Sequence, residues 1–148
     1  MKRPRAAHRP SAAKQPRAKF EPESTLAQTP CWQLGHLDLD GEWGWKHLDA
    51  PTLIDELHDK LRNFETMKWS EILSAAGGRR QGTNSHAIPI DDLCREAQQR
   101  LASLGYEDID ELFSLRLSGT CRLWGIREGR VLRVIWYDPE HQICPSPR

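Results

Sequence analysis

Residues 112–146, near the carboxyl end of the 148-residue chain, have the pattern of three short β-strands joined by two tight turns and closed by an Asp-Pro-Glu-His segment. Between positions 113 and 118 every second residue is apolar, the pattern of a strand with one buried face. Two glycine-containing segments, 119–120 and 128–130, fall where tight turns are needed. The pattern predicts a three-stranded antiparallel meander, whose third strand places Leu132, Val134 and Trp136 on one face.

The predicted meander is basic. Residues 112–137 contain only one acidic residue, Glu128. A sheet surface with this excess of positive charge is suited to contact a phosphate backbone or an acidic partner. The basic side chains are five arginines: Arg116, Arg122, Arg127, Arg130 and Arg133.

Three helices are predicted between a short early strand, which begins near Cys31, and the meander. The first helix starts near Pro51, the second is capped by Thr66, and the third starts near Pro89 after a loop rich in Gly, Asn and Ser. An early strand, about three helices and a C-terminal antiparallel meander define an α+β fold. The apolar residues expected on the inner helix faces are Leu53, Ile54, Leu57, Leu61 and Phe64, then Trp69, Ile72, Leu73 and Ala76, then Leu93, Cys94, Ala97, Leu101 and Leu104.

The first 30 residues are predicted to be a disordered basic tail, followed by a single domain over residues 31–148. Of the 21 Lys and Arg, seven lie in residues 1–19, which contain no acid, so the remaining 14 face all 21 Asp and Glu. A basic arm on an acidic body favours contact with nucleic acid, and the alternative is a charge run that is merely solvated.

The sequence predicts a cytoplasmic protein that does not associate with a membrane. The basic start is not followed by the apolar segment of a secretory signal, and no apolar run approaches the roughly 20 residues of a membrane helix. The four cysteines are widely spaced, as expected for reduced thiols. No nucleotide-binding loop or zinc-ligand spacing is present, so neither a cofactor nor a metal is expected.

The element order and the segment SLRLSGTCRLWGIREGRVLRVIWYD, residues 114–138, resemble the RelE/ParE toxin superfamily. The ending WYDPEHQICPS is also similar to small bacterial and phage proteins that end in Asp-Pro-x-His. The resemblance covers about a quarter of the chain closely, and the chain has a longer helical region than the superfamily. It implies a toxin-like protein directed at RNA, with an antitoxin as protein partner.

The resemblance also implies site residues. Superfamily members that cut mRNA use basic residues on this sheet together with a late Tyr or His. Arg116, Arg122 and Arg127 would correspond to phosphate-contacting residues, the first two in a catalytic role and Arg127 in nucleic-acid binding. His141 would lie where a general acid or base acts.

The residues themselves suit that chemistry. RNA cleavage needs a base for the 2′-hydroxyl, a cation for the phosphorane and an acid for the leaving oxygen, which histidine and arginine can supply. The alternatives are arginines that pair with helix carboxylates and a His141 that bonds a backbone carbonyl. Further nucleic-acid contacts are predicted for Arg133, His86 and Trp124, the last by base stacking; the alternative for Trp124 is half-buried packing.

The sequence therefore predicts a toxin-like, RNA-directed protein that is a candidate metal-independent endoribonuclease. The alternative is a non-enzymatic module that binds nucleic acid or protein through the same arginines.

Overall fold

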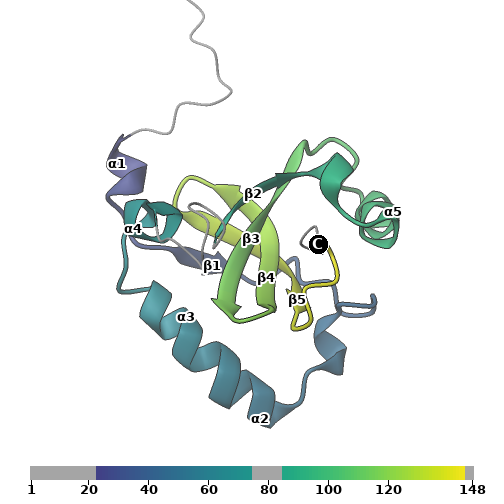
Figure 1. Cartoon of the computed structure of the whole chain (residues 1–148), viewed down its shortest axis with the longest axis horizontal. Helices are drawn as coiled ribbons and strands as arrows, with labels where there is room; N and C mark the ends of the chain where they lie inside the picture. The colour runs from purple at the N-terminus through teal and green to yellow at the C-terminus, as the bar shows by residue number, and fades with distance from the viewer. Residues whose placement is uncertain (1–22, 75–84, 146–148) are drawn as a thin grey trace, which may run out of the picture.

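The computed structural model describes residues 23–74 and 85–145. Its centre is a five-stranded mixed sheet with the strand order β1-β5-β4-β3-β2 (Figure 1). The α+β class is confirmed, with the early strand first in the chain and the antiparallel strands last. The strands are β1 (Cys31–Gln33), β2 (His86–Pro89), β3 (Glu111–Ser118), β4 (Cys121–Glu128) and β5 (Val131–Asp138).

The predicted meander is confirmed as β3, β4 and β5, which pair antiparallel in sequence order. Gly119 and Gly129 sit in its two turns with φ of 47° and 60°, a left-handed backbone that glycine adopts without steric cost. The early strand β1 joins this meander in parallel, beside β5. All three C-terminal strands therefore lie inside the sheet, with β1 and β2 at its edges.

Two β-bulges shift the predicted faces of the meander. Leu117 is an extra residue of β3 relative to β4, and Ile135 is an extra residue of β5. A bulge breaks the alternation of faces. The prediction that Leu132, Val134 and Trp136 share a face was therefore wrong: Leu132 and Val134 pack on one side, and Trp136 joins the core on the other.

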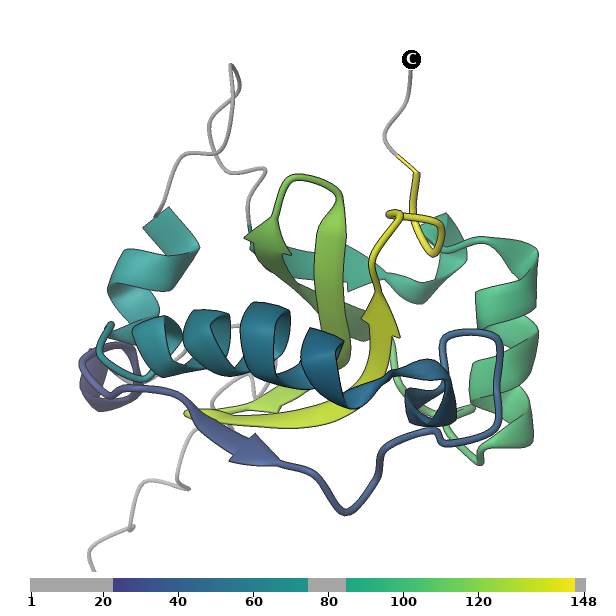
Figure 2. The same cartoon turned by 90° about the horizontal axis from the view of Figure 1, so that it is seen from below.

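Helices cover both faces of the sheet (Figures 1 and 2). On one side, α5 (Arg95–Ser103) buries Ala97 and Leu101 against Leu112, Trp124 and Trp136. On the other side lie α2 (Ala50–Thr52), the π-helix η2 (Leu53–His58), α3 (Asp59–Phe64) and α4 (Trp69–Ser74). Their core residues include Leu57, Trp69 and Ile72, packed with Phe113, Leu115 and Leu123.

The first predicted helix is present but its buried face differs from the prediction. Asp49 caps it by accepting a hydrogen bond from the Thr52 amide at 2.8 Å, and Pro51 occupies its first turn as expected. Leu57 is buried, whereas Leu53 and Ile54 are 49% and 61% exposed. The π-helical turn at 53–58 has more residues per turn than an α-helix. The 3.6-residue spacing therefore no longer places Leu53 and Ile54 on the side that faces the sheet.

The third predicted helix starts later than expected. His86–Pro89 forms the edge strand β2, which pairs antiparallel with β3, and a 3-10 turn η3 (Ile90–Asp92) precedes α5. A proline favours extended backbone in the residue before it, and at the end of an edge strand its missing amide costs no sheet hydrogen bond. Leu93 and the α5 residues Ala97 and Leu101 are buried as predicted, and Ala76 lies outside the described residues.

Residues 23–30, which the sequence assigned to the tail, belong to the folded domain. They form α1 (Glu23–Leu26) and a segment that packs on the sheet and on α4. The Gln28 carbonyl accepts a hydrogen bond from the Trp69 amide at 2.9 Å, and Arg130 Nε donates to the Thr29 carbonyl at 3.0 Å. The rest of the predicted tail, residues 1–22, lies outside the described residues. No helix in the described ranges is long and apolar enough to cross a membrane.

A buried carboxylate joins α5 to the loop after β1 and to β5. Asp38 accepts two hydrogen bonds from Arg100, at 2.9 and 2.7 Å, and one from the Trp136 indole at 2.8 Å. The Gly41 amide donates a fourth bond at 3.1 Å. Chiefly because of the Arg100 hydrogen bond, and despite burial, the pKa of Asp38 falls from 3.8 to about 2.

Replacing Asp38 by asparagine should reduce the free energy of unfolding at pH 7 by about 2 kcal/mol, because the ion pair with Arg100 is lost. A carboxylate with a lowered pKa stabilises the fold above its unfolded pKa and loses that contribution as the pH falls through its folded pKa. The difference in the free energy of unfolding between the wild type and Asp38→Asn should therefore decrease from pH 4 towards pH 2, as measured by urea unfolding.

The matched control is Asp40→Asn, which removes an exposed carboxylate paired with the exposed Lys46. Exposed ion pairs contribute little, so this change should cost less than about 0.5 kcal/mol. Equal losses for the two variants would show that the Asp38 network does not stabilise the fold.

Candidate functional site

Three charged residues form a row across one end of the sheet. Arg122 of β4 is the register partner of Arg116 on β3 and of Asp138 on β5. Directly opposed residues on neighbouring strands point to the same face. The prediction that Arg116 and Arg122 lie side by side across the Gly119 turn is confirmed.

Arg122 is a buried cation. It is only 8% exposed, and its Nη1 donates hydrogen bonds to the carbonyls of Gly119 at 2.6 Å and Cys121 at 3.2 Å. No carboxylate among residues 23–74 and 85–145 forms an ion pair with it. Burial, followed by repulsion from Arg116, lowers the pKa of the guanidinium, which is the mark of a charge held where its solvation is poor.

Asp138 lies next to Arg122, but its hydrogen-bonding capacity is used elsewhere. It is completely buried and accepts bonds from the amides of Gln142 at 2.9 Å and Ile143 at 3.0 Å and from the Trp124 indole at 3.3 Å. Asp138 therefore holds the turn that follows β5 and forms no ion pair with Arg122. Its charge only partly offsets the positive potential of the arginine pair.

His141 projects from that turn with an unusual backbone. Its φ of 56° lies in the left-handed region, which costs free energy in a residue other than glycine. The neighbouring Pro139 carbonyl accepts a hydrogen bond from the Thr120 hydroxyl at 2.7 Å, which ties the turn to the β3–β4 hairpin. The strained conformation is therefore held from two sides, by Asp138 and by Thr120.

His86 reaches the same place from β2. Its register partner is Ser114, two residues before Arg116 on β3. The Nδ1 atom of His86 is buried and has no hydrogen-bond partner in the described part of the chain. An imidazole nitrogen in this state is an unusual feature of a folded protein, and a catalytic role is one explanation for it.

The charge of Arg122 acts on both histidines. Burial, and then the charge of Arg122, lowers the pKa of His86. Burial lowers the pKa of His141 most, Arg122 next, and Arg116 and His86 also contribute, while Asp138 opposes them. Folding favours the neutral imidazoles, so this contribution to stability is present above pH 6.5 and is lost as the pH falls below it. We call His86, Arg116, Arg122 and His141 the sheet-end cluster.

The other predicted contacts lie elsewhere. Arg127 is on the opposite face, with its guanidinium carbon 4.7 Å from the centre of the Trp69 ring. Arg133 is near the β1 edge, where it donates to Gln33 at 3.0 Å. Trp124 has no exposed surface, so the predicted base stacking on its indole is corrected to a role in the core, as a partner of Asp138.

Sequence reasoning missed two polar residues of the cluster's surroundings. Ser85 is buried and its hydroxyl accepts a hydrogen bond from the Arg116 amide at 3.0 Å. The other is Asp138, whose position next to a proline at a strand end is typical of a carboxylate that binds backbone amides. Ser85 sits in a segment whose composition indicates a loop, so no local signal marked it.

The cluster can bind an anion and transfer protons. Two guanidiniums offer hydrogen bonds suited to phosphate oxygens, and two imidazoles with pKa values below 6.5 start as neutral bases. Within the described residues, no group of three or more His, Cys, Asp and Glu is arranged to hold a metal ion. Comparisons with protein-family models, curated proteins and solved structures gave no match for this chain.

Replacing Arg122 by glutamine should raise the pKa of both His86 and His141, because the guanidinium charge disfavours protonation of each imidazole. The measurement is a pH titration of the imidazole signals by NMR. Saturating inorganic phosphate should move both pKa values in the same direction in the wild type, since the anion offsets the same charge.

Arg133→Gln is the control, because it removes one positive charge from the same sheet far from the cluster and should leave both titrations unchanged. Where Arg122→Gln impairs folding, the phosphate titration of the wild type still tests the electrostatics. Phosphate that moves neither histidine would contradict the assignment of an anion site.

Proposed function

We propose that this protein is a metal-independent endoribonuclease that cleaves RNA at the sheet-end cluster. The observation that carries the proposal is the buried guanidinium of Arg122, which has no carboxylate ion-pair partner among the described residues and sits among Arg116, His86 and His141. A buried charge without a counter-ion is costly, and a substrate anion would supply that counter-ion.

The charge pattern favours a phosphodiester as the anion. Arginine offers several N–H donors in a planar fork that matches phosphate oxygens. Two such groups on neighbouring strands can contact one phosphate from two directions and stabilise the additional negative charge of a phosphorane. Of the three arginines that the resemblance assigned to phosphate contact, Arg116 and Arg122 lie opposite each other on neighbouring strands, and Arg127 lies on the other face.

The two histidines complete the chemistry that RNA cleavage requires. One neutral imidazole takes the proton of the 2′-hydroxyl, whose oxygen then forms a bond to phosphorus. The bond from phosphorus to the 5′-oxygen breaks, and the second imidazole, protonated, donates its proton to that leaving oxygen. The products are a 2′,3′-cyclic phosphate and a 5′-hydroxyl. We assign these two roles to His86 and His141 as a pair.

The internal nucleophile makes the reaction specific to RNA, because DNA lacks the 2′-hydroxyl. In the cell, the substrate would be cytoplasmic RNA, and the activity would be that of a RelE/ParE-like toxin controlled by an antitoxin protein. Such an antitoxin would have to cover the sheet-end cluster or neutralise its arginines.

The protein should cleave a labelled single-stranded RNA in the presence of EDTA, and the 5′ fragment should end in a 2′,3′-cyclic phosphate. His141→Ala and His86→Ala should each lower kcat/KM by roughly 10²-fold or more, the range typical of a lost general acid or base. A 2′-deoxy substitution at the cleaved nucleotide should block the reaction. The measurement is product analysis on denaturing gels together with mass spectrometry.

The control is His58→Ala, which removes an exposed histidine of η2 and should not affect cleavage. Circular dichroism establishes that each variant is folded. RNA binding that depends on Arg116 and Arg122, with no cleavage, would replace the proposal by the non-enzymatic binding module. Full activity of both histidine variants would contradict the assigned chemistry.

A further inference from the structure

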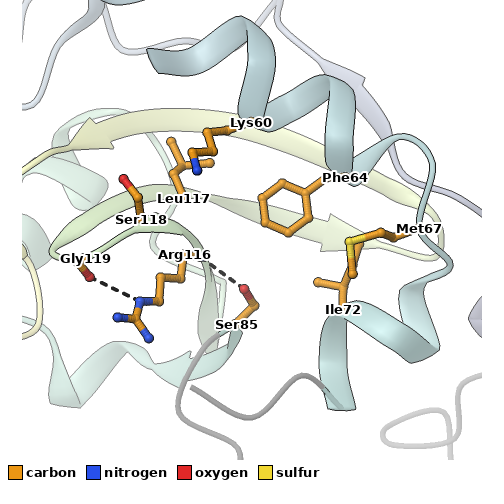
Figure 3. A pocket seen from close by; sticks show the side chains of 9 residues that line it. All are labelled: Lys60, Phe64, Met67, Ile72, Ser85, Arg116, Leu117, Ser118 and Gly119. Carbon is orange, nitrogen blue, oxygen red and sulfur yellow. Dashed lines mark hydrogen bonds between the residues drawn. The ribbon is translucent and has the colours of Figure 1, made fainter. Parts of the chain in front are cut away.

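A cleft of about 290 Å³ opens beside the sheet-end cluster, between β3 and the helices α3 and α4 (Figure 3). It shares Ser85, Arg116 and Gly119 with the cluster and its immediate surroundings. The Arg116 side chain itself extends towards Gly119 and away from Lys60 and Phe64 (Figure 3). A strand bound at Arg116 would therefore reach the cleft by passing around the edge of β3, where Ser85 and Gly119 also line it. The remaining residues of its wall are Lys60, Phe64, Met67, Ile72, Leu117 and Ser118.

One helix supplies an aromatic ring and a cation to this cleft. Lys60 and Phe64 are four residues apart in α3, which places them on the same side of the helix. Figure 3 shows both side chains extending towards β3, with Phe64 beside Met67. Phe64 is only half-buried, so part of the ring is open to a ligand.

Among the described residues, the wall of the cleft carries positive charge and no acid. Its charge is that of Lys60, while Arg116 borders the cleft with its guanidinium turned towards Gly119 (Figure 3). Its apolar residues include Phe64 and Leu117. A second hollow of about 370 Å³, beside the turn at 138–142, has the opposite charge. Its wall contains Glu42, Asp49, Glu56 and Glu140, which repel a phosphate backbone.

An aromatic face next to cations is the combination that binds single-stranded nucleic acid, because bases stack on the ring while the backbone follows the charges. We propose that this cleft holds the nucleotide next to the cleaved phosphate, with its base against Phe64 and its outer phosphate at Lys60. The assignment rests on the RNA cleavage proposed above and names where the strand leaves the cluster. The acidic wall of the second hollow would repel the RNA, which favours the cleft at Lys60 and Phe64 as its path.

The test combines a protein change with a substrate change. A series of RNA hexamers carries one abasic nucleotide at each position in turn around the cleaved bond. With the wild type, removing the base at one position should lower kcat/KM about tenfold, the scale of one lost stacking contact. With Phe64→Leu, the intact hexamer should show a similar loss, and the abasic substitution at that position should have little further effect.

Lys60→Gln provides an independent measurement that does not disturb the core. Loss of one phosphate contact should reduce the slope of log affinity against log salt concentration by about 0.7 for a single strand. The matched control is Arg62→Gln on the same helix, an exposed cation that is absent from the cleft wall and should leave the slope unchanged. Ile54→Ala, at an exposed apolar residue, is the matched control for Phe64→Leu.

Failure of this subsite is distinguishable from failure of the cleavage proposal. If no cleavage is detected, fluorescence anisotropy measures the affinity for the same hexamers with a 2′-deoxy nucleotide at the central position. The subsite is supported if one abasic position weakens binding to the wild type but has little further effect on binding to Phe64→Leu. Two results together would overturn the subsite. In the first, the loss from Phe64→Leu and the loss from each abasic nucleotide multiply at every position, as independent effects do. In the second, Lys60→Gln leaves the salt slope unchanged. Those two results would indicate that the cleft binds an apolar side chain of a protein partner and not a base.

Discussion

The site depends on which groups donate hydrogen bonds to the carboxylate of Asp138. Both of its oxygens accept hydrogen bonds, from two backbone amides of the following turn and from the Trp124 indole in the core. These bonds attach the turn to the sheet and hold His141 in its left-handed conformation. They also leave Arg122, on the next strand, without an ion-pair partner in the described part of the chain. One buried carboxylate thus positions the histidine and only partly compensates the positive charge of the arginine.

The two bulges are the backbone feature that makes this arrangement possible. The extra residue Ile135 reverses the facing of β5 beyond it, so that Asp138 comes to lie on the face of Arg122 and Trp124. The extra residue Leu117 shifts the register of β3 on β4 by one residue, so that Arg116 lies opposite Arg122 and on the same face. Bulges next to functional sites often re-aim side chains in this way.

Sequence patterns reached the meander and the Arg116–Arg122 pair because both depend on local information. Alternation and turn glycines define the strands, and a short hairpin brings the residues that flank its turn close together. That Arg116 lies directly opposite Arg122, and not opposite Leu123, depends on the bulge at Leu117. The bulges, the π-helical turn at 53–58 and the exposure of Leu53 and Ile54 depend on tertiary packing, which no local period records. Likewise, His86 reaches the cluster only because β2 pairs with β3, and Pro89 in that segment favoured a helix start instead. The sequence therefore named His86, Arg116, Arg122 and His141 but could not show that they share one place, nor that Trp124 is buried.

The lowered pKa values of the two histidines bear on how the proposed reaction would obtain its acid. In the substrate-free protein, burial and the charge of Arg122 favour the neutral form of both imidazoles, which serves a base but not an acid. A phosphodiester bound to Arg116 and Arg122 would bring a negative charge into the same poorly solvated space. That charge opposes the effect of the guanidiniums and favours protonation of the nearest imidazole. Substrate binding and uptake of the catalytic proton would then be thermodynamically linked, so that the acid form is produced where and when the leaving oxygen is present.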